Sequence, residues 1–187
     1  MVTTLISSLL RFSTTRLKRF DMDRNEYLLL RKAFKPIDVR LAIVAESPPI
    51  SGKYFYDISG SIKEPLFAAM MLQLGIAPKS KESGLKEFQK RGWMLVDATY
   101  EPVNAMGKSR DEVITRDYEL LREDLRSLLG RSQPIALIKE NVCRLLEPKL
   151  VADGFNVLNR GRVVYFPSTG RQNQFHNQFS AVTGELI

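Results

Sequence analysis

Short apolar runs alternate with helical patterns four times along this chain, and this alternation limits its possible folds more than any other feature. The runs are rich in β-branched residues, as buried strands are, and lie at 39–45, 93–98, 134–138 and 162–166. Amphipathic stretches surround them, at 22–34, 64–76, 83–92, 109–130, 141–154 and 169–182. The pattern predicts an α/β protein, a three-layer α/β/α sandwich with a central four-stranded parallel sheet.

Start and stop residues mark several of the expected helices. Pro36 stops the first helix, and Gly75 ends the second, which has Pro65 in its first turn. Ser109 is a candidate cap of the long fourth helix. Pro148 is a candidate interruption of the helix at 141–154.

Polar segments follow the predicted strands at their carboxyl ends. They read AESPP after the first strand, DATYEP after the second, KEN after the third and PSTGRQ after the fourth. Ligands of open parallel sheets bind in the crevice beyond these ends. We therefore expect the functional site where the four segments converge.

Length and composition suggest one soluble domain with a short extension. Residues 1–37 are expected to form a basic helical extension, and residues 38–187 the α/β domain. No apolar run reaches the ~18 residues that span a bilayer, so we expect no membrane contact. A monomer is the expected state.

One cysteine and one histidine argue against a disulfide framework, an iron–sulfur cluster and a zinc site. We expect no cofactor or metal, and a reducing, cytoplasmic location. Cys143 is interpreted as a small buried thiol, because it lies in an amphipathic pattern.

Positive charge is concentrated at the start of the chain, which carries a net charge of +7 overall. A basic surface commonly meets phosphate, in nucleic acid or in lipid headgroups. Residues 1–20 also contain no acid and resemble a mitochondrial transit peptide, so mitochondrial targeting stays open. The alternative is a basic helix that packs on the domain or touches DNA.

Two strand-end motifs resemble those of the uracil-DNA glycosylase superfamily. The first, Ala45-Glu46-Ser47-Pro48-Pro49, is similar to the family's G-[QEIM]-[DNA]-P-[YG]; the second, Phe166-Pro167-Ser168-Thr169-Gly170, is similar to H-P-S-P. The segments 92–104 and 134–146 resemble the strands between them, so the likeness covers roughly residues 38–187. It implies the family's fold and excision of a base from DNA, in DNA repair.

The chain departs from the family pattern at four points. Ser47 stands where many members carry a carboxylate or Asn, and Phe166 stands where the His that stabilises the leaving base is expected. His176 lies ten residues later and is a doubtful substitute. Asp97 replaces the Asn that reads the uracil edge. The four cluster cysteines of some members are absent.

The resemblance implies roles for the first loop. Glu46, with Ser47 beside it, is the candidate catalytic position, where a carboxylate orients water or faces a cationic sugar. Pro48 stiffens the loop. Three aromatic residues are expected to stack on an extruded base, or else to pack in the core: Tyr54, Phe55 and Tyr56.

Asp97 at the end of the second strand is the candidate base reader. An ionised carboxylate only accepts hydrogen bonds, so it would repel the O4 of uracil unless it were protonated. We therefore expect a deaminated purine or another modified base to fit better than plain uracil. Capping of the following loop, or pairing with an arginine, is the alternative.

The second motif is the candidate DNA-facing segment, able to bind a phosphate at a helix start. Its residues are Ser168, Thr169, Gly170, Arg171 and Gln172. Lys108 and Arg110 are further candidates for backbone contact. The alternative is that Ser168 or Thr169 merely caps the last helix.

Three functions follow from these residues. The first is a metal-independent DNA glycosylase that hydrolyses the N-glycosidic bond of uracil or another modified base in single- or double-stranded DNA. The second is a catalytically decayed glycosylase fold that binds DNA or a protein. The third is a hydrolase or transferase acting on a small nucleotide, although no Gly-rich phosphate loop is present.

Overall fold

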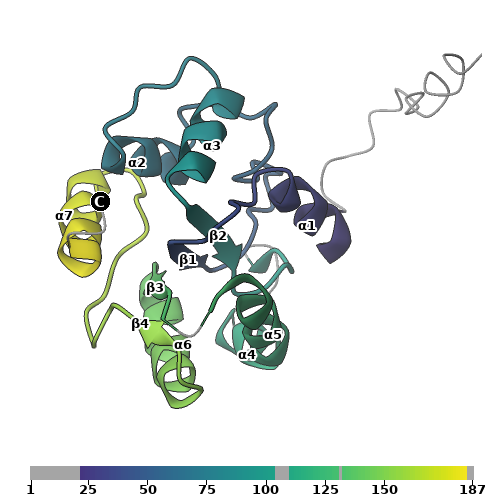
Figure 1. Cartoon of the computed structure of the whole chain (residues 1–187), viewed down its shortest axis with the longest axis vertical. Coiled ribbons are helices and arrows are strands. Elements are labelled where there is room, and N and C mark those ends of the chain that lie inside the picture. The colour runs from purple at the N-terminus through teal and green to yellow at the C-terminus, as the bar shows by residue number, and fades with distance from the viewer. Residues whose placement is uncertain (1–21, 104–109, 131, 185–187) are drawn as a thin grey trace, which may run out of the picture.

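A computed structural model describes residues 22–103, 110–130 and 132–184. The expected cap Ser109, Lys108 and the candidate targeting segment at 1–20 lie outside these residues. Within them, seven helices surround one four-stranded parallel sheet. The predicted α/β class is confirmed, and the arrangement is consistent with a three-layer sandwich (Figure 1).

The sheet is built on a buried central strand. Strand β1 (Leu41–Ala45) pairs in parallel with β2 (Trp93–Asp97) on one side and with β3 (Pro134–Leu137) on the other. A short β4 (Asn156–Val157) completes the order β2-β1-β3-β4. All of β1 and β2 is buried, as expected for strands that are covered on both faces.

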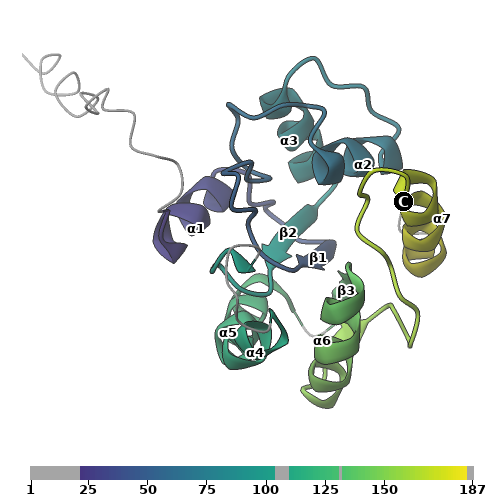
Figure 2. The same ribbon diagram turned by 180° about the vertical axis from the view of Figure 1, so that it is seen from behind.

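Alternate residues of the strands feed two separate cores. Leu41, Ile43 and Ala45 face the core formed with α2 (Pro65–Gln73), α3 (Lys81–Lys90) and α7 (Gln172–Thr183). Ala42 and Val44 face the core formed with α4 (Arg110–Arg116), α5 (Tyr118–Leu128) and α6 (Glu140–Ala152). The same two helix groups flank the sheet when it is seen from behind (Figure 2). The period-two alternation of a strand thus produces the layers.

Several predicted boundaries need small corrections. The pattern at 109–130 forms two helices, because Asp117 leaves helical geometry between α4 and α5. Pro148 lies inside α6 without ending it. Gly75 and Gly154 follow α2 and α6 with positive φ, the conformation expected of a glycine after a helix.

The predicted fourth strand at 162–166 is not a strand. The two-residue β4 lies earlier in the chain, and the buried side chain of Asn159 then takes the place of the next strand residue. It accepts from the Leu137 amide at 2.7 Å and donates to the Leu137 carbonyl at 3.0 Å. Residues 162–166 run past this point without regular secondary structure, and the Val164 carbonyl accepts from the Lys139 amide at 2.7 Å. The prediction placed the strand at 162–166 because it relied only on the β-branched residues of that segment.

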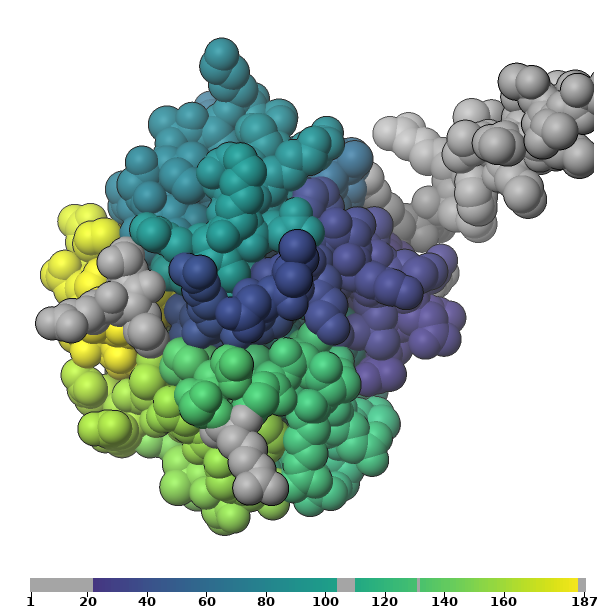
Figure 3. Space-filling view, viewed as in Figure 1, coloured from purple at the N-terminus to yellow at the C-terminus, as the bar shows by residue number. Residues whose placement is uncertain are grey.

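Helix α1 (Arg24–Lys32) packs on the domain, so this part of the proposed extension contributes to the core. Tyr27 and Phe34 belong to the first core, while the Arg31 guanidinium binds both carboxylate oxygens of Asp124 on α5, at 2.6 and 2.7 Å. Arg31 also donates to the Tyr100 hydroxyl at 2.9 Å. The space-filling view shows the purple α1 segment between the teal and green layers (Figure 3).

Arg31→Met is expected to lower the free energy of unfolding by about 3–5 kcal/mol, because it leaves the Asp124 carboxylate buried without its charged partner. Denaturant unfolding measures this loss. Lys86→Met is the matched control, since Lys86 pairs with Glu82 on the exposed face of α3. The control should lose no more than about 0.5 kcal/mol. Similar losses in both variants would show that the buried pair does not fix α1.

Candidate functional site

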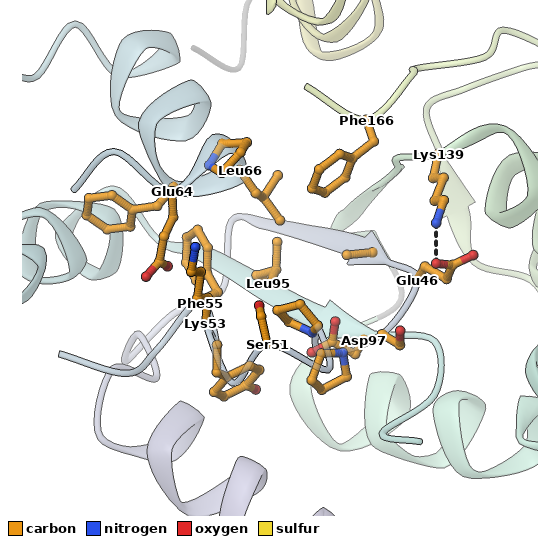
Figure 4. Close-up of a pocket in the computed structure, with 17 residues that line it drawn as sticks. Glu46, Ser51, Lys53, Phe55, Glu64, Leu66, Leu95, Asp97, Lys139 and Phe166 are labelled. Carbon is orange, nitrogen blue, oxygen red and sulfur yellow. Dashed lines mark hydrogen bonds and ion pairs between the residues drawn. The ribbon is translucent and has the colours of Figure 1, made fainter. Parts of the chain in front are cut away.

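The carboxyl ends of β1, β2 and β3 meet around a cavity of about 390 Å³. Three charged or acidic residues of its lining, Glu46, Asp97 and Lys139, come from the strand ends, and further polar residues come from the loop before α2. Much of the rest of the wall is apolar, with Phe55, Leu66, Leu95 and Phe166 among its residues (Figure 4). A cavity of this size with few convergent polar groups is the usual form of a small-ligand site.

Glu46 directly follows β1 and is held by two donors. Its Oε1 accepts from the Asn141 side-chain amide at 2.7 Å, and its Oε2 forms an ion pair with the Lys139 ammonium. Glu46 is 6% exposed, while both partners come from the segment after β3. Figure 4 shows Lys139 reaching this carboxylate from the β3 side. The carboxylate is thus fixed in one orientation at the cavity wall.

Asp97 is the second buried acid, and its surroundings are different. It is 4% exposed, lines the cavity and, among the described residues, makes no hydrogen bond through Oδ2. Burial raises its pKa to about 7, opposed by the positive charge of Arg31 and supported by the negative charge of Asp124. Asp97 is therefore largely a neutral acid below pH 7.

Three of the five buried side-chain atoms without a hydrogen-bond partner among the described residues belong to Asp97, Tyr54 and Asn141, which line this cavity or contact its Glu46. They are the Asp97 Oδ2, the Tyr54 hydroxyl and the Asn141 Oδ1. Buried polar groups are nearly always paired in folded proteins, so a cluster of exceptions needs an explanation. A bound ligand or water that supplies the missing partners is the simplest one.

The three loop aromatics do not act as one surface. Tyr54 and Phe55 line the cavity, but all three rings are at most 5% exposed and belong to the first core. Tyr56 is outside the lining: its hydroxyl accepts from the Leu95 amide at 2.8 Å and contacts the Leu95 carbonyl at 3.2 Å. We therefore correct Tyr56 from a base-binding residue to a core residue that fastens the loop to β2.

A buried ion pair fixes the far end of this loop. The Lys81 ammonium donates to Glu64 Oε2 and to the Tyr54 carbonyl, at 2.5 and 2.6 Å. Glu64 Oε1 in turn accepts from the Ser61 amide at 2.9 Å. Gly60 is needed here, since a Cβ at this position would lie 2.4 Å from Glu64 Oε1. The chain between β1 and α2 is thus anchored on both sides of the cavity.

The remaining predicted residues divide between the cavity and a neighbouring one. Ser47 and Pro48 line the main cavity. Ser168 and Arg171 line an adjacent cavity of about 550 Å³, which shares Lys139 and Phe166 with the first. Thr169, Gly170 and Gln172 are exposed beside it. Neither Ser168 nor Thr169 caps α7, whose N-cap is Arg171 without a side-chain bond.

The adjacent cavity is rich in arginine. Arg110, Arg144 and Arg171 line it together with Lys139. Arg144 pairs with Asp111, and Arg171 lies over the Tyr165 ring, 4.8 Å from its centroid. Arg110 has no ion pair within the described ranges. Asp111 and Glu140 also line this cavity, so its four basic side chains outnumber its acidic side chains by two.

His176 does not replace the histidine expected at the second motif. Its Nδ1 lies 2.9 Å from the Gln73 amide nitrogen, which also donates to the His176 carbonyl. An amide nitrogen only donates, so Nδ1 accepts and the ring proton sits on Nε2. This pair joins α7 to α2 and lies outside the cavity lining.

Lys139 and Asn141 were not assigned roles from the sequence, although both lie in the KEN segment after the third strand. The sequence signal for both was their position directly after an apolar run.

The part of the chain that the structure describes holds no group of three or more metal-ligating side chains. None of its helices is long and apolar enough to cross a membrane. Cys143 is buried and unpaired, as predicted.

Comparison with known proteins gives no relative. No family model, no curated protein and no solved structure matches this chain.

The raised pKa of Asp97 predicts a pH-dependent stability. Between about pH 4 and pH 7 the unfolded chain releases this proton while the folded protein keeps it, so the contribution of Asp97 to stability falls as pH rises. Asp97→Asn removes this effect. Relative to that of the wild type, the free energy of unfolding of the variant should rise by as much as about 4 kcal/mol between pH 4 and pH 8. Denaturant unfolding across this range measures the difference, and a constant difference would contradict it.

Proposed function

We propose that this protein is a DNA glycosylase-like enzyme that hydrolyses the N-glycosidic bond of a modified base. The observation that carries the proposal is the pair of buried acids at adjacent strand ends, in a cavity of about 390 Å³ that has room for a nucleobase. Glu46 is fixed by Lys139 and Asn141, while the Asp97 Oδ2 has no partner among the described residues. The two acids are thus prepared for different tasks.

In this proposal Glu46 is the catalytic carboxylate. The bond between the sugar C1′ and the base nitrogen breaks, and its electron pair leaves with the base. A water oriented by Glu46 adds its oxygen to C1′ and passes its proton to the carboxylate. The negative charge of Glu46 also favours the cationic sugar of the transition state. No metal is required for these steps.

Asp97 is the proposed base reader. As a neutral acid it both donates and accepts hydrogen bonds, so it can do what an Asn would do at this position. The repulsion expected between Asp97 and the O4 of uracil applies only when the Asp97 carboxyl is ionised. Uracil and hypoxanthine each present an N–H beside a carbonyl oxygen, and both suit this neutral form. We propose them as the first substrates to test.

The adjacent arginine-rich cavity is the proposed contact for the DNA backbone. It opens beside the base cavity and shares Lys139 and Phe166 with it. Backbone phosphate lies next to the sugar in any nucleotide, so a base in one cavity would bring phosphate toward the other. Arginine suits this role, because its planar fork matches phosphate geometry.

A recognition protein is the second candidate, and one observation favours it. Phe166 lines the cavity where the resemblance calls for a histidine that stabilises the leaving base, and a phenyl ring donates no hydrogen bond. In that case the cavity would bind an extruded base without releasing it. The assay below separates the two functions.

Glu46→Gln is expected to reduce base release by about 10²–10⁴-fold, because the amide cannot take the proton of water. Oligonucleotides carrying uracil, hypoxanthine, xanthine or normal bases are incubated at pH 6 and tested for alkali-sensitive abasic sites. DNA affinity should persist in the variant. Binding without release by the wild type, on every substrate, would support the recognition protein instead.

Arg171→Ala is expected to weaken DNA binding on all sequences and to reduce the slope of log affinity against log salt by about 1. The matched control is Arg91→Ala, because Arg91 is exposed at the end of α3, just before the amino end of β2, and lines neither cavity. Both variants lose one charge. Titrations at several salt concentrations give the slopes, and an equal slope for the two variants would place the DNA elsewhere.

A further inference from the structure

Lys139 has an unusual backbone for a residue with a side chain. Its φ is 85° and its ψ is 136°, a region that is occupied almost only by glycine. Within the described ranges one other non-glycine residue has a positive φ, Arg160, which lies at 48° in a turn. Polar residues visit that left-handed helical region at lower cost.

The surrounding chain holds Lys139 in this conformation. Its amide donates to the Val164 carbonyl at 2.7 Å, and its carbonyl accepts from the Cys143 amide at 3.0 Å. The preceding Ile138 amide donates to Val44 on β1, also at 3.0 Å. Glycine would meet these backbone requirements without strain, so the requirement for lysine must come from its side chain.

The side chain places a cation at the boundary between the two cavities. Lys139 lines both of them, and its ammonium pairs with the Glu46 carboxylate. The side chain is 28% exposed, far more than that of Glu46. An ammonium has three N–H donors, and one contact with Glu46 leaves capacity for a ligand.

Other candidates for a donor to the departing base are poorly placed. Phe166 is apolar, and His176 is engaged with Gln73 outside the cavity lining. Lys53 lines the cavity but is exposed on the loop and has no ion pair within the described part of the chain. Lys139 is thus the anchored cation of this cavity.

We propose that Lys139 is a catalytic residue whose ammonium binds the negative charge that the base acquires as its bond to the sugar breaks. This inference rests on the proposed glycosylase function and adds a residue to it. The bond electrons go to the base, the water proton goes to Glu46, and Lys139 stays protonated throughout. It contributes by electrostatic stabilisation, as a donor that is already held in place by Glu46.

The first test does not require catalysis. Free 5-nitrouracil is an anion at neutral pH, because its nitro group withdraws electrons, whereas free uracil is neutral. The wild type should bind 5-nitrouracil more tightly than uracil in calorimetric titrations at neutral pH. Lys139→Gln should lose at least about tenfold of this preference, and Lys139→Arg should keep part of it. Lys86→Gln is the matched control and should keep all of it, because Lys86 is exposed on α3 and lines neither cavity.

The second test uses release from DNA. Lys139→Gln should lower the rate about 10²–10³-fold for uracil, the size of effect seen when one transition-state donor is removed. It should lower the rate less for 5-fluorouracil, whose anion needs less stabilisation. A purely structural lysine would affect both bases equally. A covalent DNA adduct trapped by borohydride through Lys139 would instead identify a nucleophile and overturn the proposal.

The two proposals fail in different ways. Equal affinity of wild type and Lys139→Gln for 5-nitrouracil, in folded protein, overturns the role of Lys139. A wild type that prefers the anion but releases no base from any oligonucleotide overturns the glycosylase function and keeps Lys139 as an anion-binding residue.

Melting curves show whether the variants at Lys139 are folded. Lys139→Gly should melt above Lys139→Ala, because glycine relieves the strained φ.

Discussion

The pairing of β1 on both sides is the constraint on which the site depends. Its register puts Ala45 opposite Asp97 on β2 and Val44 opposite Leu137 on β3. The chain therefore leaves three adjacent strands at one edge, and the next residues are Glu46, Ala98 and Ile138. A shift of one residue in either pairing would turn the side chains to opposite faces. The full burial of β1 makes such a shift costly in free energy, so the strand ends that form the site have fixed positions relative to one another.

Much of the surrounding structure keeps the first loop in place around these strand ends. Tyr56 ties the loop to β2, and the ion pair of Lys81 with Glu64 ties its far end to the start of α2 and of α3. Two features of the site cost free energy: the strained backbone of Lys139, and the buried Oδ2 of Asp97, which has no hydrogen-bond partner in the part of the chain that the structure describes. A fold optimised for stability alone would place glycine and a paired side chain there. Costs of this kind concentrated at one cavity are typical of sites that are kept for function.

The sequence predicted most of the fold because its signals were local. The runs at 39–45 and 93–98 are apolar along their whole length, and glycines or prolines mark several helix ends. The prediction of the fourth strand was wrong because the Asn159 side chain forms the hydrogen bonds to β3 that a strand backbone would form. The β-propensity of a segment does not describe bonds of this kind. Glu46 and Asp97 were predictable as polar residues at strand ends. The same signal pointed to Lys139, but a positive φ at a lysine and its pairing with Glu46 depend on tertiary contacts.

The two acids of the cavity have different neighbours. Asp97 lies among tyrosine rings and close to the buried Arg31, has low exposure, and also lines a second cavity of about 420 Å³ beside Tyr100. Glu46 lies toward Lys139, which is shared with the arginine-rich cavity. A ligand that satisfies both ends has a planar polar edge at Asp97, an electron-poor centre near Glu46 and an anionic group beyond Lys139. Under the proposed function these parts would be the base, the sugar and the phosphate of a nucleotide. Lys139 lines both cavities, so its ammonium would lie where the departing base and the phosphate come nearest to each other.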